Sequence, residues 1–147
     1  MSFSPLFSPG FNDIEDKSLE KYFLNGFPGS KTRSQLIEGL KIYISALKNY
    51  LFTYEIWIDG SFVTNKMDPG DIDLLVLFSS SDYNSLSSSD QRALVKLLDN
   101  YLAKQSFGCD VYFCVLENEK LKSYWRGWFG FDRRDEPKGI ARIRVNI

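Results

Sequence analysis

Two aspartates open an apolar run, and this pairing constrains the fold of the chain more than any other feature. Asp71 and Asp73 flank Ile72 and are followed directly by the apolar residues 74–78. A run that is apolar on both faces predicts a central strand that is covered on each side. Because successive side chains of a strand point to opposite faces, the two carboxylates would project from the same face. An unpaired charge inside such a strand is costly, so the pair predicts a bound cation.

A Gly-Ser turn precedes the Asp-x-Asp strand. Residues 55–58 predict a short buried strand that runs into Gly60-Ser61, and residues 65–70 predict a loop by their turn-forming composition. A glycine lets the backbone approach a phosphate closely, and the Ser61 hydroxyl can donate a hydrogen bond to its oxygens. The turn and the acids together predict a phosphate-binding site beside Mg²⁺ or Mn²⁺.

The composition excludes several other kinds of site. The chain has no histidine and two cysteines, Cys109 and Cys114. Their odd spacing within one strand predicts opposite faces, which argues against a disulfide between them. Zinc sites, Ser-His-Asp triads and Cys-His pairs are disfavoured by the same composition. Carboxylates, hydroxyls, lysine and arginine remain to carry any chemistry.

Length and charge predict one domain over residues 1–147. A chain of 147 residues with 44% apolar residues can bury one sizeable core. Its net charge of -1 predicts no long-range attraction to nucleic acids or acidic membranes. Neither a leader-like segment nor a membrane-spanning apolar stretch is apparent, so we expect a cytoplasmic protein with no membrane partner.

The flanking elements predict an α+β fold, a mixed sheet flanked by helices. Residues 1–29 predict an irregular N-terminal arm, with one helical segment at 16–24. A helix opened by a capping pair, Thr32 and Gln35, follows, with apolar residues at steps of three and four. Further predicted elements are a surface loop at 79–89, a helix from 89 that ends at Gly108, a strand at 111–116, a helix at 119–128 and a half-buried edge strand at 143–147.

These motifs resemble the DNA polymerase β-like nucleotidyltransferase superfamily. Its hallmarks are a Gly-Ser turn, an acid-x-acid pair and a third acid on a later strand, which here match Gly60-Ser61, Asp71-Ile72-Asp73 and Asp110. The resemblance covers the core region, about residues 30–116, and implies a minimal fold of that superfamily. Residues 56–66, 124–127 and 137–140 are also similar to a family of small bacterial proteins, most of them of unknown function.

The resemblance implies a role for each matching residue. Asp71 and Asp73 would bind both metal ions, and Asp110 the ion that activates the acceptor hydroxyl. Gly60 and Ser61 would hold the triphosphate, with Lys66 adding positive charge. The implied activity moves a nucleoside monophosphate from a nucleoside triphosphate (NTP) to a hydroxyl of RNA or tRNA, a protein side chain or a small molecule, in a housekeeping, toxin–antitoxin or phage-defence setting.

Other interpretations stay open. Asp71 or Asp110 could serve only as a turn residue, and Asp59 is equally a turn residue or a neighbour of the metal site. The C-terminal aromatics fit a packed core or base stacking, and the nearby cations fit phosphate contacts or protection of a strand edge. A non-catalytic nucleotide-binding or antitoxin-like regulator, with a helical protein partner, is the alternative function. The C-terminal aromatics are Tyr124, Trp125, Trp128, Phe129 and Phe131, and the nearby cations are Arg126, Arg133, Arg134, Lys138, Arg142 and Arg144.

Overall fold

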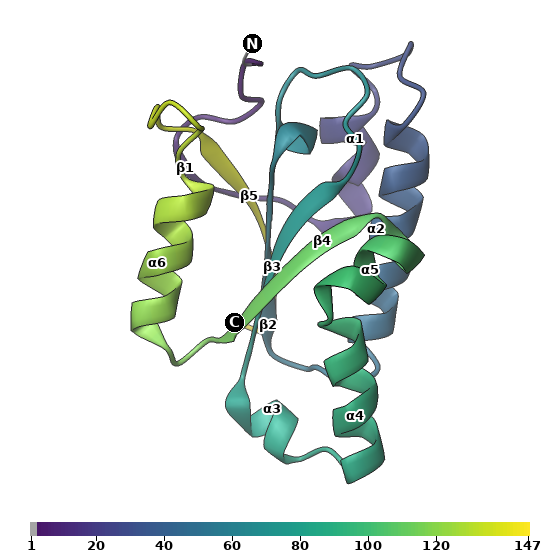
Figure 1. Cartoon of the computed structure of the whole chain (residues 1–147), viewed down its shortest axis with the longest axis vertical. Coiled ribbons are helices and arrows are strands. Elements are labelled where there is room, and N and C mark those ends of the chain that lie inside the picture. The colour runs from purple at the N-terminus through teal and green to yellow at the C-terminus, as the bar shows by residue number, and fades with distance from the viewer. Residues whose placement is uncertain (1–2) are drawn as a thin grey trace.

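A five-stranded mixed sheet forms the middle of the protein in the computed structural model, which describes residues 3–147 (Figure 1). The spatial order is β1-β5-β2-β3-β4. The central strand β2 is antiparallel to β3 and β5, whereas β1 pairs with β5 and β3 with β4 in parallel. The predicted α+β class is confirmed. The strands are β1 (Gly10–Asp13), β2 (Tyr54–Asp59), β3 (Ile72–Phe78), β4 (Cys109–Val115) and β5 (Gly139–Val145).

The helices are distributed unequally over the two faces of the sheet. Four of them pack against one face, and only α6 (Glu119–Phe129) lies on the other (Figure 1). The four are α1 (Leu19–Phe23), α2 (Arg33–Leu47), α4 (Ser88–Leu97) and α5 (Asn100–Phe107), and the short α3 (Ser80–Asn84) lies at the lower end of the view, level with α4. One face is therefore largely covered and the other is more open.

Strand alternation divides the buried residues into two cores. Ile56 and Ile58 point to the α2 side, and Trp57 between them points to the α6 side. The same alternation places Cys109 in the larger core and Cys114 in the smaller one. Both cysteines are free, as their spacing predicts. All of β2 and nearly all of β3 are buried, which confirms the predicted central strands.

The predicted edge strand is wrong, because β5 lies between β1 and β2. Residues 10–13 of the expected irregular arm form β1 and pair with residues 139–142. Arg142 forms two bonds to the Asp13 carboxylate, of 2.7 and 3.2 Å. Arg144 Nε lies 3.7 Å from Glu55 Oε2. The alternating charges therefore arise from ion pairs on the α6 side of the sheet and do not protect an edge.

Short polar caps explain the other differences from the predicted elements. The serine-rich segment is helical in part, because Ser79 caps α3 and Ser87 caps α4. The single helix predicted before Gly108 is two helices, since the Asp99 side chain accepts a hydrogen bond from the backbone N–H of Leu102 and starts α5. Gly108, in a left-handed conformation, ends α5 as predicted.

The predicted helix after residue 32 is confirmed as α2, but its predicted capping pair is wrong. The Ser30 hydroxyl accepts a hydrogen bond from the N–H of Arg33, at 3.1 Å, and Thr32 makes no such bond. The helix predicted at 119–128 is confirmed as α6. Within residues 3–147, no helix has the length and apolar character needed to cross a membrane.

Candidate metal and nucleotide site

Three carboxylates meet where the parallel strands β3 and β4 begin. Asp73 and Asp110 are register partners on these strands, and Asp71 lies one residue before β3. Each residue offers one oxygen to a group in which all ligand atoms lie within 4.8 Å of one another. All three residues are partly buried. The structure thus brings together the three acids that the sequence motif predicts.

Gly60 packs directly against this carboxylate group. Its φ of +83° is a conformation that L side chains rarely adopt, and a Cβ built there would lie 2.6 Å from Asp73 Oδ2. The next residue, Ser61, starts a 3₁₀ turn, Ser61–Val63, and is partly exposed. The predicted Gly-Ser turn therefore lies beside the acids, and only glycine fits at its first position.

Lys66 is the predicted site residue for which the structure gives no contact with the acids. Its ammonium nitrogen lies 5.7 Å from the centre of the Phe3 ring. Among the described residues, Lys66 forms no ion pair with a carboxylate. Its role beside the β and γ phosphates stays a prediction.

Helix α5 supplies two partners of the acids that the motif does not contain. Asn100 donates hydrogen bonds to Asp110 Oδ1 and, at 3.0 Å, to the carbonyl of Val111. Lys104, one turn later, places its Nζ 3.2 Å from Asp71 Oδ2. The four-residue spacing on a helix just before Asp110 is the sequence signal that could have indicated them.

Burial and mutual repulsion make the site electrostatically unfavourable for its own acids. The pKa of Asp73 is raised to about 6, first by burial and then by the charges of Asp71 and Asp110. The positive charge of Lys138 acts in the opposite direction. A group of acids held together in this way would be stabilised by a cation.

Asp59 is a buried member of the site and not a turn residue. It ends β2 opposite Asp73, is 4% exposed, and its Oδ1 lies 2.9 Å from Lys138 Nζ. Burial raises the pKa of Asp59 to about 7, more than Lys138 lowers it. Lys138 comes from the segment just before β5, so the C-terminal part of the chain also reaches the site.

A fully buried arginine fixes the chain that follows the Gly-Ser turn. Arg33 on α2 donates to the carbonyls of Phe23 and Phe62, at 3.1 and 2.9 Å. Its other terminal nitrogen donates to the carbonyls of Thr64 and Lys66, at 2.8 and 2.7 Å. Burial lowers the pKa of Arg33 to about 10, which leaves it charged at neutral pH. Sequence patterns did not indicate this role.

The C-terminal aromatics divide between core and surface. Trp125 and Phe129 pack on the smaller core beneath α6, as expected for packing residues. Tyr124, Trp128 and Phe131 are exposed, so the packing interpretation is wrong for these three.

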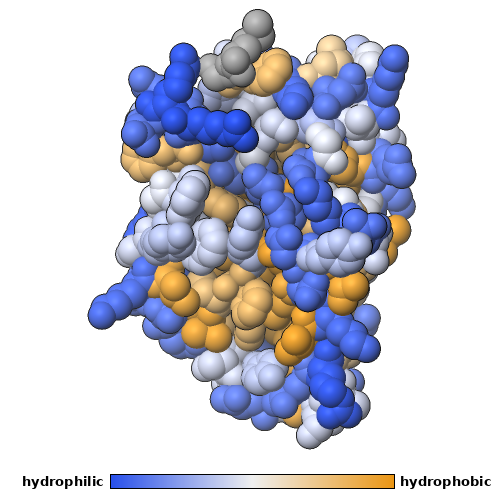
Figure 2. Space-filling model, in the orientation of Figure 1, coloured by the Kyte–Doolittle hydropathy of each residue, from blue (hydrophilic) through white to orange (hydrophobic). Residues whose placement is uncertain are grey.

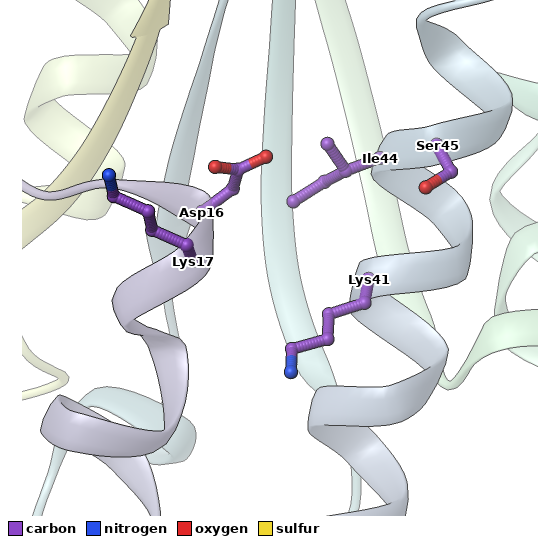
Figure 3. Close-up of a pocket in the computed structure, with 5 residues that line it drawn as sticks. All are labelled: Asp16, Lys17, Lys41, Ile44 and Ser45. Carbon is purple, nitrogen blue, oxygen red and sulfur yellow. The ribbon is translucent and has the colours of Figure 1, made fainter.

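A pocket elsewhere on the molecule is separate from the acids. Figure 3 shows it between the N-terminal segment and α2, lined by Asp16, Lys17, Lys41, Ile44 and Ser45. Two ion pairs account for its central charges, since Lys41 pairs with Glu20 and Lys48 Nζ lies 3.0 Å from Asp16 Oδ2. The pocket contains none of the predicted site residues.

Comparison with known proteins gives one match. Residues 1–144 match the model of DUF6932, a family of unknown function. No curated protein and no solved structure matches the chain.

Proposed function

We propose that this chain, which belongs to the DUF6932 family of unknown function, is a metal-dependent nucleotidyltransferase. It would move a nucleoside monophosphate from an NTP to a hydroxyl acceptor. One observation carries the proposal: the carboxylates of Asp71, Asp73 and Asp110 converge beside Gly60, whose conformation leaves no side chain between the turn and the acids.

The donor set fits Mg²⁺ or Mn²⁺. All the converging ligand atoms are carboxylate oxygens, which these hard cations prefer, and the partly buried acids repel one another without a cation. Bound divalent ions would neutralise phosphate charge and favour ionisation of the acceptor hydroxyl. Asp71 and Asp73 would hold both ions, and Asp110 the one on the acceptor side.

The residues around the acids suit the binding of a triphosphate. The backbone at Gly60 can approach phosphate oxygens closely, and the Ser61 hydroxyl can donate a hydrogen bond to them. Lys104 and Lys138 supply positive charge at two edges of the carboxylate group. The resemblance gives Lys66 the role of supplying positive charge to the phosphates. Lys104 and Lys138 suit this role better than Lys66, because they form ion pairs with carboxylates of the site and Lys66 forms none within residues 3–147.

The acceptor side of the site is held by α5. Because Asn100 donates to Asp110 and to the adjoining backbone, it fixes the orientation of that carboxylate before any substrate binds. In the transfer step, the acceptor oxygen bonds to the α-phosphorus while the bond from that phosphorus to pyrophosphate breaks. The hydroxyl proton leaves to solvent, so the step needs no histidine.

The test of the proposal is transfer of label from each α-labelled NTP, with Mg²⁺, to total RNA or to the proteins of a lysate. We expect labelled acceptor and released pyrophosphate with the wild type, and a loss of at least about a hundredfold with Asp73→Asn. The exposed carboxylate of α4, changed by Asp90→Asn, is the matched control and should leave transfer unchanged.

Calorimetry separates binding from transfer. NTP affinity that is equal with and without divalent metal would contradict the proposal. Metal-dependent NTP binding without transfer to any acceptor would instead favour a nucleotide-sensing regulator.

A further inference from the structure

Three aromatic rings in contact, and a fourth one helical turn further along α6, lie on the more open face of the sheet. The Tyr112 ring lies 4.8 Å from the Trp125 ring, which lies 5.2 Å from Tyr124, measured between ring centres. Trp128 follows Tyr124 by one helical turn and shares its side of α6. We call these four residues the aromatic strip. Three of its rings are exposed, by 37% at Tyr112, 55% at Tyr124 and 63% at Trp128.

The strip begins beside the three acids. Tyr112 follows Asp110 by two residues on β4, so both side chains project from the same face, about 7 Å apart along the strand. After burial, the charges of Asp110 and Asp73 are the largest causes that raise the pKa of Tyr112, which agrees with this proximity. From there the strip continues onto α6 through the contact of Tyr112 with Trp125. Figure 2, in the orientation of Figure 1, shows an apolar area in its lower half, between the positions of α6 and α4.

The segment around the strip carries an excess of positive charge. Residues 119–138, which are α6 and the loop that follows it, contain six basic and four acidic residues, although the whole chain has a net charge of -1. Arg133 and Arg134 are exposed and follow Trp128 in the loop that leads to Lys138. Exposed rings interleaved with cations are typical of surfaces that bind single-stranded nucleic acids.

We propose that the aromatic strip stacks unpaired bases of a single-stranded nucleic acid and directs its terminal hydroxyl to the acids. Every base has a face that can stack on a ring, so such a surface tolerates any sequence. A duplex keeps its bases stacked internally and cannot use the rings in this way. Binding by the strip requires only the described surface, whereas the role of the bound end as acceptor rests on the proposed nucleotidyltransferase function.

The test is fluorescence anisotropy with a labelled single-stranded RNA of about twelve nucleotides, compared with the same sequence as a duplex. We expect the single strand to bind more tightly than the duplex. Replacing both exposed rings of α6, in Tyr124→Ala with Trp128→Ala, should weaken single-strand binding at least tenfold, because each stacked base contributes about 1–3 kcal/mol. The aromatic variants Tyr124→Phe with Trp128→Phe should retain binding within about threefold.

A matched control removes an exposed ring elsewhere. Phe52 is 69% exposed and lies just before the first residue of β2, whereas Asp59 and the site lie at the last. Phe52→Ala should therefore leave RNA binding unchanged. The double alanine variant should also keep metal-dependent NTP binding in calorimetry, because neither ring contacts the acids.

Three results would overturn the inference. The first is no single-strand binding by the wild type, and the second is equal binding by the wild type and the double alanine variant. The third is a wild-type dimer in sedimentation that is monomeric in the double alanine variant. The last result would assign the strip to contact between copies of the chain. RNA binding that depends on the rings, in a protein that binds no NTP, would support the strip and count against the proposed function alone.

Discussion

At the scale of single residues, Asp59 and Asp73 link the site to stability through their protonation. The pKa of each is raised in the folded protein, to about 7 and about 6, from an ordinary value of 3.8. The folded state therefore binds these protons more tightly than the unfolded state does. Their contribution to stability is complete below pH 3.8 and is lost as the pH rises through about 6 to about 7.

We predict that the metal-free protein becomes less stable as the pH rises from about 4 to about 7. Asp73→Asn should reduce this pH dependence, since it removes one of the two titrating groups. Urea unfolding of both proteins over this range measures the effect. Carboxyls with lowered pKa act below their ordinary values, 3.8 for Asp13 and Asp68 and 4.5 for Glu20, so the part of the window above 4.5 reports the two raised groups. Identical pH dependence in both proteins would contradict the prediction.

Arg33 is the residue whose loss should cost the fold most. We expect Arg33→Met to lower the free energy of unfolding by about 3 kcal/mol, because four buried or part-buried carbonyls lose their donor. Urea unfolding gives the value. The exposed Arg92 on α4 is the matched control, and Arg92→Met should change stability by less than about 0.5 kcal/mol. Similar effects of the two substitutions would show that the carbonyl contacts of Arg33 contribute little.

At the scale of elements, sequence patterns predicted those strands and helices that form from residues close together in the chain. The apolar strands β2 and β3 and the amphipathic α2 could be found from composition and period alone. Strand β1 could not, because its four residues have no apolar run and form a strand only through partners at residues 139–142. The mistaken edge position of β5 follows from the same omission.

The residues of the candidate site also differ in whether the sequence alone could indicate them. Asp71, Asp73 and Asp110 could be predicted, since all three belong to the motif order on which the resemblance rests. The helical crossover of residues 79–108 then allows β3 and β4 to pair in parallel and brings Asp73 and Asp110 side by side. Asn100 was hidden because Asp99 starts a new helix within what the period predicts as one. Lys138 was hidden because its approach to Asp59 depends on how β5 enters the sheet.

Strand β1 should protect β5 from pairing with other molecules. Deleting residues 1–13 removes its backbone pairing and the Phe11 ring, which packs 4.8 Å from Trp57, between ring centres. We expect the truncated protein to self-associate, because β5 would become an exposed edge. Light scattering after gel filtration measures this. A deletion of residues 1–3 keeps β1 and is the control, and a monomeric long deletion would contradict the prediction.

At the scale of the whole molecule, the unequal covering of the sheet separates stability from function. The face under α2, α4 and α5 holds the larger core, and the face under α6 holds the smaller core, the acids and the aromatic strip. Under the proposed function, substrates would therefore bind on the face that holds the smaller core, while the larger core lies on the other face.

Ligand binding should nevertheless stabilise the molecule as a whole. We predict that a non-hydrolysable NTP with Mg²⁺, at about a hundred times its Kd, raises the free energy of unfolding by about 2.7 kcal/mol. Either component alone should do much less, because Mg²⁺ needs phosphate oxygens to complete its ligands. Thermal melting measures the shift, and Asp73→Asn should abolish it. A shift produced equally by the nucleotide without metal would contradict the prediction.

The pairing of β1 with β5 also has a consequence during synthesis. Strand β1 leaves the ribosome well before its partner at residues 139–142, because residues 14–138 separate the two. The β2 edge that β5 occupies stays open for the same period. Such long-range pairing is slow to form, and the sheet can be completed only after residues 139–145 have left the ribosome. Until then β1 and one edge of β2 lack their partner strand, and such unpaired edges are open to pairing with other chains.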